Sequence, residues 1–175
     1  MAVPVEGQVS VGGFTVFVEA DITRPSNTTQ YTANDQVSHV TGTSLLQFKG
    51  CARTAGGTGI IYSGVMFDSV DAATNPNFSL VLFDTLDITS VADNSAAAVI
   101  DAQVSAVVAC ITFDGTNSSN VHTIGANLVI TATGINQAFR CAPGSRDLYG
   151  MVIDRGGYTP AALEQIRFRL GILQD

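Results

Sequence analysis

The amino-acid sequence predicts an all-β fold, a jelly-roll-like antiparallel β-sandwich with one short helix. About nine short segments alternate apolar and polar residues, and turns rich in Gly, Asn, Ser and Pro separate them at regular spacing. Helical spacing of apolar residues is clear in one stretch only. The 175 residues suit a single domain. We place this domain at residues 14–175, after a nearly uncharged N-terminal arm at residues 1–13.

The clearest predicted strand is residues 78–83, FSLVLF, in which both alternating sets of side chains are largely apolar. One face of such a strand can enter the core between two sheets. The other face, which includes Phe83 if Phe78 points inward, needs cover. A helix, a long loop or another subunit could supply it.

Four strands are predicted before this one. They are residues 14–18, residues 31–37 with a turn at Asn34 and Asp35, residues 45–53 and residues 60–67. Strand 45–53 alternates cleanly and has one polar face. Strand 60–67 has apolar side chains on both faces, with Ile60, Tyr62 and Met66 expected on the same one.

After the clearest strand, a helix of two to three turns is predicted from Ser95 to Ser105, because Ile100, Val104 and the valines that follow have helical spacing. Asn94 or Ser95 would cap it. The remaining expected elements are a strand at 107–113, a polar loop at 114–120, strands at 128–132, 137–141 and 148–154, a capped helical turn at 158–165 and a last strand at 166–173. That last strand places Ile166, Phe168, Leu170 and Ile172 inward and Arg167 and Arg169 outward.

Composition excludes several classes of function. Hydrophobic residues make up 46% of the chain and charged residues 13%, so much of the surface is neutral or covered by partners. The net charge of −7 repels phosphate backbones, so no nucleic-acid partner is expected. No run is long and apolar enough to span a membrane, and the first residues do not resemble a signal peptide, so we expect synthesis in the cytoplasm and no membrane partner.

Charges and cysteines are unevenly distributed. No Lys or Arg lies between Thr54 and Phe139, although seven Asp residues do. This polarity either orients neighbouring subunits or marks a solvated acidic half. Cys51, Cys110 and Cys141 are odd in number and widely spaced, which is typical of buried free thiols in a reducing compartment.

Catalytic and metal-binding patterns are weak. His39 and His122 have no second His, Cys or carboxylate at ligand spacing, and the sequence contains no nucleophile-elbow motif. Adjacent Asp residues and the DGTN segment at Asp114 fit ordinary turns better than calcium loops or glycosidase carboxylates. We therefore expect loop histidines, no metal, no cofactor and no enzymatic activity.

A carbohydrate-binding sandwich is the main non-viral alternative. Lectin-like sites usually present aromatic platforms, and Trp is absent from this chain. An exposed cluster of Tyr31, Tyr62, Tyr149 and Tyr158 would favour such a function.

Three segments together resemble a family of tailed-phage virion proteins described as head decoration, cement or minor capsid proteins. They are TRPSNTTQYTANDQVS at 23–38, FSLVLFDTLDITSVADNSA at 78–96 and LYGMVIDRGGYTPAALEQIRFRLGI at 148–172. The first resembles the family's opening, the second its Leu-Phe strand and Asp-Asn pair, and the third its closing strands with a Tyr-Thr-Pro turn. The Ala- and Val-rich stretch 95–109 and the loop 114–120 depart from that pattern.

The resemblance implies a jelly-roll sandwich without enzymatic activity that assembles with itself and with the major capsid protein. On this reading the chain is a capsid cement protein on the outer surface of the phage head, made in the host cytoplasm and oligomeric as a dimer or trimer. A tail-associated module is the alternative position. The side chains expected to make contacts are Phe67, Phe83, Arg167 and Arg169.

Overall fold

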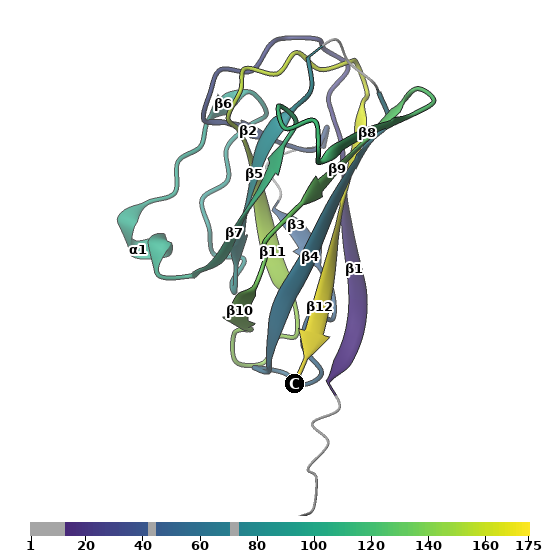
Figure 1. The fold of residues 1–175 in the computed structure, drawn as a ribbon. Helices are drawn as coiled ribbons and strands as arrows, with labels where there is room; N and C mark the ends of the chain where they lie inside the picture. The colour runs from purple at the N-terminus through teal and green to yellow at the C-terminus, as the bar shows by residue number, and fades with distance from the viewer. Residues whose placement is uncertain (1–12, 42–44, 71–73) are drawn as a thin grey trace, which may run out of the picture.

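The computed structural model describes residues 13–41, 45–70 and 74–175, and in it two antiparallel sheets pack face to face (Figure 1). The first sheet contains β1 (Phe14–Thr23), β4 (Thr58–Asp68), β8 (Val121–Ile124), β9 (Asn127–Ala132), β10 (Gln137–Arg140) and β12 (Gln165–Gln174). The second contains β2 (Asp35–Val37), β3 (Leu46–Phe48), β5 (Asn77–Phe83), β6 (Ser95–Ala96), β7 (Val107–Asp114) and β11 (Leu148–Asp154). A single-turn helix, α1 (Asp101–Val104), lies outside both sheets.

The strand pairing is that of a jelly roll. The first sheet has the order β1-β12-β4-β9-β8 with β10 also on β4, and the second has the order β6-β2-β11-β5-β7 with β3 also on β11. The main pairs are nested along the chain: β1 with β12, β2 and β3 with β11, β4 with β9, and β5 with β7. Such nesting arises when one long antiparallel hairpin rolls up into two sheets. The predicted fold class is confirmed.

The core lies between the two sheets. In β12, Ile166, Phe168, Leu170 and Ile172 are each 0% exposed, as the alternation predicted. The ring of Phe168 packs edge-on against Phe113 of β7, with ring centroids 5.3 Å apart. Burying one such side chain contributes on the order of 2 kcal/mol, so the inner faces supply most of the stability.

The strand β5 is buried on both faces, as its composition predicted. Its inner face belongs to the main core, whereas Phe83 forms a second cluster with Ile88, Met151 and Ile153 on the outer face of the second sheet. The cover is a long loop of the same chain, residues 84–106, which we call the covering segment. Of the three kinds of cover considered, the chain uses the loop.

The helix predicted from Ser95 to Ser105 is mostly wrong. Ser95 and Ala96 form β6 on the edge of β2, and α1 is a single turn whose N-cap, Ile100, makes no side-chain capping bond. Ile100 and Val104, which have the helical spacing, are 54% and 55% exposed, whereas Ala97, Val99 and Ala106 pack on the cluster around Phe83. Tertiary contacts with the second sheet override the helical preference of this stretch.

The two faces of β4 were assigned wrongly because of a bulge. Gly171 of β12 pairs with Ser63 and Ile172 pairs with Ile61, so Tyr62 is an extra residue. The phase of alternation changes there, and Ile61 and Met66 share the inner face while Tyr62 points outward. The outer face still carries apolar residues on both sides of the bulge, Tyr62 before it and Phe67 after it.

One strand is shorter than predicted, and one predicted helical turn does not form. The strand predicted at 45–53 ends at Phe48, because Gly50 turns the chain with φ +72°, a conformation that favours glycine. No helical turn forms between Tyr158 and Gln165. Instead, the Glu164 carboxylate accepts a hydrogen bond from the Ala161 amide at 2.7 Å and closes the turn by a side chain.

Cys51 and Cys141 are buried free thiols, as predicted, and burial raises their pKa values to about 12 and about 11. Cys110 is exposed, contrary to expectation. It lies on the outward phase of β7, between the buried Ala109 and Ile111. The strand β7 is at the edge of its sheet, and the covering segment leaves Cys110 exposed.

Candidate functional site

The outer face of the first sheet brings together three of the four predicted contact residues. Arg167 of β12 is the cross-strand partner of Phe67 in β4. The guanidinium of Arg169 lies over the Phe67 ring, 5.0 Å from its centroid. The alternation of β4 and β12 places these side chains outward, so they form one surface in the middle of the sheet.

Phe83 lies elsewhere. It is 0% exposed, on the outer face of the other sheet and beneath the covering segment. A side chain in this position stabilises the covering segment and offers no surface to a partner of the folded chain. Its place in the structure is therefore that of a packing residue.

The two arginines are already paired within the chain. Arg167 Nε donates to Asp21 Oδ1 at 2.7 Å, and Arg169 Nε donates to Glu19 Oε1 at 2.5 Å. Both acidic residues come from β1, the edge strand beside β12. We call these four residues the charge ladder. Its charges cancel, so the ladder has little long-range attraction for a charged partner.

Next to the charge ladder is an exposed apolar patch made by Phe17, Tyr62 and Leu173. Their exposed fractions are 64%, 41% and 38%. Phe17 is the cross-strand partner of Gly171, and the Tyr62 ring lies over the same glycine. A Cβ at position 171 would lie 2.2 Å from Ser63 Oγ and 2.8 Å from Tyr62 Cζ, so glycine is what leaves room for these two side chains.

Sequence reasoning did not select these three residues as contact residues, and considered Tyr62 only as part of an aromatic cluster. Placing Phe14, Val16 and Val18 on one face of the first strand leaves Phe17 on the other. Continuing the outward series of Arg167 and Arg169 reaches Leu173. Tyr62 could not be found this way, because the bulge that turns it outward leaves no mark on the apolar pattern.

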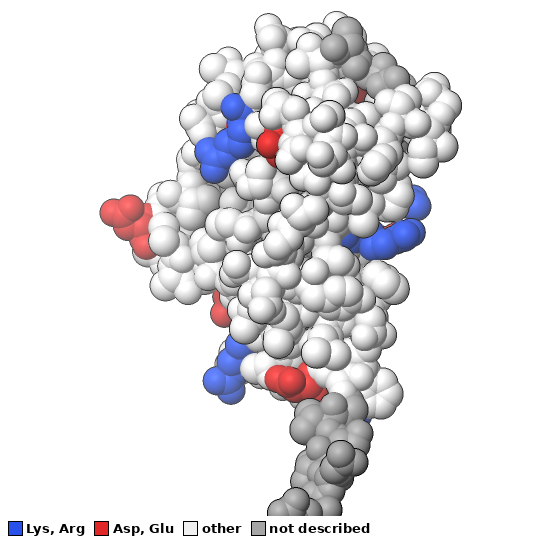
Figure 2. Space-filling view, viewed as in Figure 1, with Lys and Arg blue, Asp and Glu red and all other residues white. Residues whose placement is uncertain are grey.

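Most of the visible surface is uncharged. Figure 2 shows Lys, Arg, Asp and Glu in a few separate places on an otherwise neutral face. This agrees with a charged fraction of only 13%. A partner on such a surface would lose little hydration of charged groups on binding.

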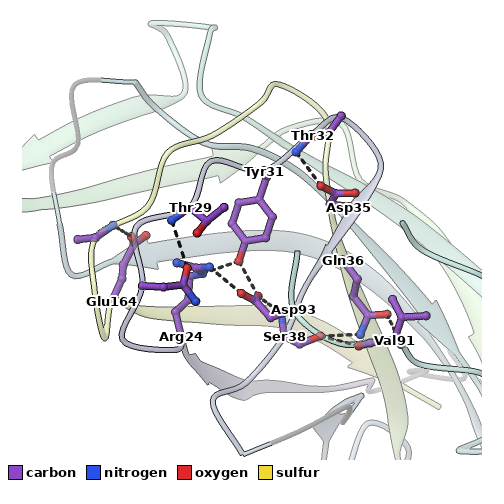
Figure 3. A network of polar contacts seen from close by, with 12 residues as sticks. Arg24, Thr29, Tyr31, Thr32, Asp35, Gln36, Ser38, Val91, Asp93 and Glu164 are labelled. Atoms are coloured by element: carbon purple, nitrogen blue, oxygen red, sulfur yellow. Dashed lines mark hydrogen bonds and ion pairs between the residues drawn. The ribbon is translucent and has the colours of Figure 1, made fainter. Parts of the chain in front are cut away.

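A dense polar network lies where β1 ends, and Figure 3 shows Arg24, Tyr31 and Asp93 pointing toward one another. Arg24 Nη2 contacts Asp93 Oδ2 at 2.7 Å and the Tyr31 hydroxyl donates to Asp93 Oδ1 at 2.6 Å, while Arg24 Nε also donates to the Tyr31 hydroxyl. Burial is the main reason why the pKa of Tyr31 lies far above its usual value, and the hydrogen bond to Asp93 also raises it. Arg24 is 0% exposed. This network holds loops together and has no access for a substrate.

The same network joins the three segments on which the phage resemblance rests. Asp93 belongs to the second segment and binds Arg24, Tyr31 and the Ser38 amide of the first. The third segment accepts backbone hydrogen bonds from the first, from the Tyr31 amide to the Tyr158 carbonyl and from the Arg24 amide to the Glu164 carbonyl, both at 2.9 Å. The polar network therefore connects parts of all three quoted segments at one end of the sandwich.

A second buried polar cluster contains Asp68, Tyr158 and Glu164, each 1% exposed. The Tyr158 hydroxyl lies 2.6 Å from Glu164 Oε1 and 3.3 Å from Asp68 Oδ2. Burial, with a contribution from the nearby Glu164, raises the pKa of Asp68 to about 8. Burial also raises the pKa of Tyr158 far above its usual range.

The residues considered for catalysis do not come together as an active site. His122 lies exposed on β8 rather than in a loop, and Nδ1 of His39 accepts a hydrogen bond from the Thr41 amide. The Asp114 carboxylate accepts from the Thr116 hydroxyl and amide, which lowers its pKa and makes an ordinary turn. In the described ranges, no three His, Cys, Asp or Glu residues lie close enough to hold a metal ion.

The four tyrosines do not form the aromatic platform that would favour a lectin-like site. Tyr31, Tyr149 and Tyr158 are at most 8% exposed, and only Tyr62 reaches the surface. In the part of the chain that the structure describes, no helix has the length and hydropathy of a membrane span.

Comparison of the chain with protein-family models, with curated proteins and with solved structures gives no match.

Proposed function

We propose that this chain is a structural virion protein, a cement or decoration protein that binds the outer surface of a phage head and stabilises contacts between major capsid proteins. The resemblance of three segments supplies the phage context. The observation that carries a binding role is the open outer face of the first sheet, where the apolar patch adjoins the charge ladder. An apolar centre with a polar margin is the usual composition of a protein interface.

The patch and the ladder have different roles in this proposal. Burying Phe17, Tyr62 and Leu173 against the shell supplies affinity, because together they expose much apolar area in the free chain. The ladder, with Phe67 beneath Arg169, sets the orientation through its ordered side chains. A cement protein works by mass action: it binds the assembled shell and not free subunits, so its binding energy adds to the stability of the shell.

Copies of the chain are also expected to associate as a dimer or trimer. Four basic side chains, Lys49, Arg53, Arg140 and Arg146, are exposed and form no ion pair with any described residue. Exposed acidic residues such as Asp87 and Asp101 lie in the covering segment. Opposite charges on separate regions allow contacts between neighbouring copies that weaken with salt. Sedimentation of the purified chain at low and high salt measures this directly.

The proposed function is tested on particles. Proteomics of purified virions must find the chain, and particles that lack it must regain heat resistance when purified protein is added. Tyr62→Ala should weaken rebinding about tenfold or more, the effect of losing an aromatic residue at the centre of an interface. Gln137→Ala, an exposed change on β10, serves as the control. The proposal would be contradicted if proteomics did not find the chain in native virions, or if the two variants rebound equally well.

A further inference from the structure

A pocket of about 450 Å³ opens on the outer face of the first sheet, at the end opposite to the apolar patch. Its walls come from β1, β4, β9 and β12, where Thr23, Ser69, Asn127 and Gln165 surround Phe67 and Val129. This volume is in the range of small-molecule sites in proteins. The pocket is separate from the buried Arg24 network and from the cluster around Phe83.

The charges that line the pocket cancel. Asp21 and Arg167 at its wall are bound to each other. The third charged group in the lining is Asp68, whose neighbour Tyr158 has a single hydroxyl hydrogen. That hydroxyl lies 2.6 Å from Glu164 Oε1 and 3.3 Å from Asp68 Oδ2, so its one hydrogen cannot fully compensate two buried carboxylates. Burial and the neighbouring Glu164 therefore favour the neutral form of Asp68.

Neutrality decides which ligands fit. A phosphate or sulfate would need an unpaired cation, and the one arginine in the lining is held by Asp21. A metal ion would need several ionised carboxylates, whereas Asp21 is paired with Arg167 and the buried Asp68 favours its neutral form. A neutral ligand faces neither obstacle.

The remaining lining has the composition of a sugar site. The Thr23 and Ser69 hydroxyls and the Asn127 and Gln165 amides can each both donate and accept hydrogen bonds. The Gln165 side chain forms no hydrogen bond with any described residue, and Asn127 uses its amide only for a long, 3.3 Å contact to the Ile124 carbonyl. Phe67 and Val129 add an apolar wall, which suits the C–H face of a pyranose ring.

We propose that this pocket binds a neutral saccharide, with Asn127 and Gln165 as its principal hydrogen-bonding residues. The pocket shares Asp21, Phe67 and Arg167 with the face proposed to contact the capsid. A shell docked on that face would cover the pocket, so we expect sugar binding by the free chain.

The test is a set of amide NMR titrations of the full chain with glucose, galactose, mannose and N-acetylglucosamine. We expect at least one sugar to give saturable shifts at residues 127–129 and 165–167. Asn127→Ala and Gln165→Ala should each weaken that sugar about tenfold, the effect of losing one or two hydrogen bonds. Gln137→Ala, the same residue type at the far end of the sheet, should leave its affinity unchanged.

The proposal is overturned if none of the four sugars shifts these amides, or if the Gln137 variant binds as weakly as the Gln165 variant. Titration with inorganic phosphate and with calcium tests the argument from charge. If phosphate or calcium shifts the same amide signals and binds with higher affinity than every sugar, the pocket is not a site for neutral ligands. Because these experiments use the free chain, a negative result would not bear on the capsid proposal. Likewise, failure of the chain to bind particles would not bear on sugar binding by the pocket.

Discussion

The two outer faces of this sandwich differ in how their apolar residues are covered. On the second sheet, Phe83 and Met151 are buried by the covering segment of the same chain. On the first sheet, Phe17 and Tyr62 remain exposed beside a ladder of paired charges. The apolar content of a strand thus indicates that a face needs cover, but the fold decides whether the chain or a partner supplies it.

The largest difference between the two faces should appear in stability. Phe83→Ala removes a fully buried ring from the covered face and should lower the free energy of unfolding by about 3–5 kcal/mol. Phe17→Ala, the matched change on the open face, should alter it by about 0.5 kcal/mol or less. Urea denaturation of both variants measures the contrast. Equal losses would mean that the faces are not covered differently.

The covering segment should depend on the buried ion pair that anchors it. Arg24→Met leaves the Asp93 carboxylate without its partner and should cost about 3 kcal/mol. Arg146→Met, at an exposed arginine that forms no ion pair with the described residues, should cost about 0.5 kcal/mol or less.

Hydrogen exchange of the Arg24 variant locates the effect. Amides of residues 84–106 should exchange faster, because the anchor of the covering segment is lost. Unchanged exchange there would show that the polar network does not hold this segment in place.

Stability should fall as the pH rises from about 4 to 8. The pKa of Asp68 in the folded chain, about 8, is above its ordinary value of 3.8, because burial and Glu164 disfavour the charged form. In this window the folded state holds a proton that the unfolded state has released, so stability decreases with pH, by at most about 1.4 kcal/mol per unit. Asp68→Asn should remove this part of the slope in urea titrations at several pH values. An unchanged slope would contradict a protonated Asp68.

The charge ladder should contribute little to stability. Arg169→Ala removes an exposed pair with Glu19 and should change the free energy of unfolding by less than about 1 kcal/mol. Its effect on particle binding should be larger, because the Arg169 side chain also orders Phe67 on the proposed docking face. Comparison of denaturation with particle rebinding for this one variant separates the two roles. A stability loss as large as that of Phe83→Ala would instead make the ladder a folding element.

Much of the fold could be predicted because alternation reports burial directly. The last strand is an example, since its four inward residues are all fully buried. The stretch after Asn94 could not be predicted, because the residues with helical spacing, Ile100 and Val104, stay exposed, and other residues of the stretch pack on the second sheet. The bulge at Tyr62 was also hidden, since its only effect is to exchange two apolar faces.

The site was predicted in part for the same reason. The outward phase of β12 gave Arg167 and Arg169. Phe67 was selected separately, from a strand that is apolar on both faces, and the structure makes it the cross-strand partner of Arg167. Their pairing with Glu19 and Asp21 depends on β1 lying beside β12, a contact between the two ends of the chain that no local pattern reveals. The pocket and the buried Asp68 depend on four strands converging, so only the structure could show them.

The most direct test of the open face is cryo-electron microscopy of the native particle. We predict density for this sandwich on the outer shell, with β1, β12 and β4 toward the capsid and Phe17 and Tyr62 buried in the contact. Density in which these strands face solvent, or an outer shell without the sandwich, would contradict the assignment of this face as the docking surface.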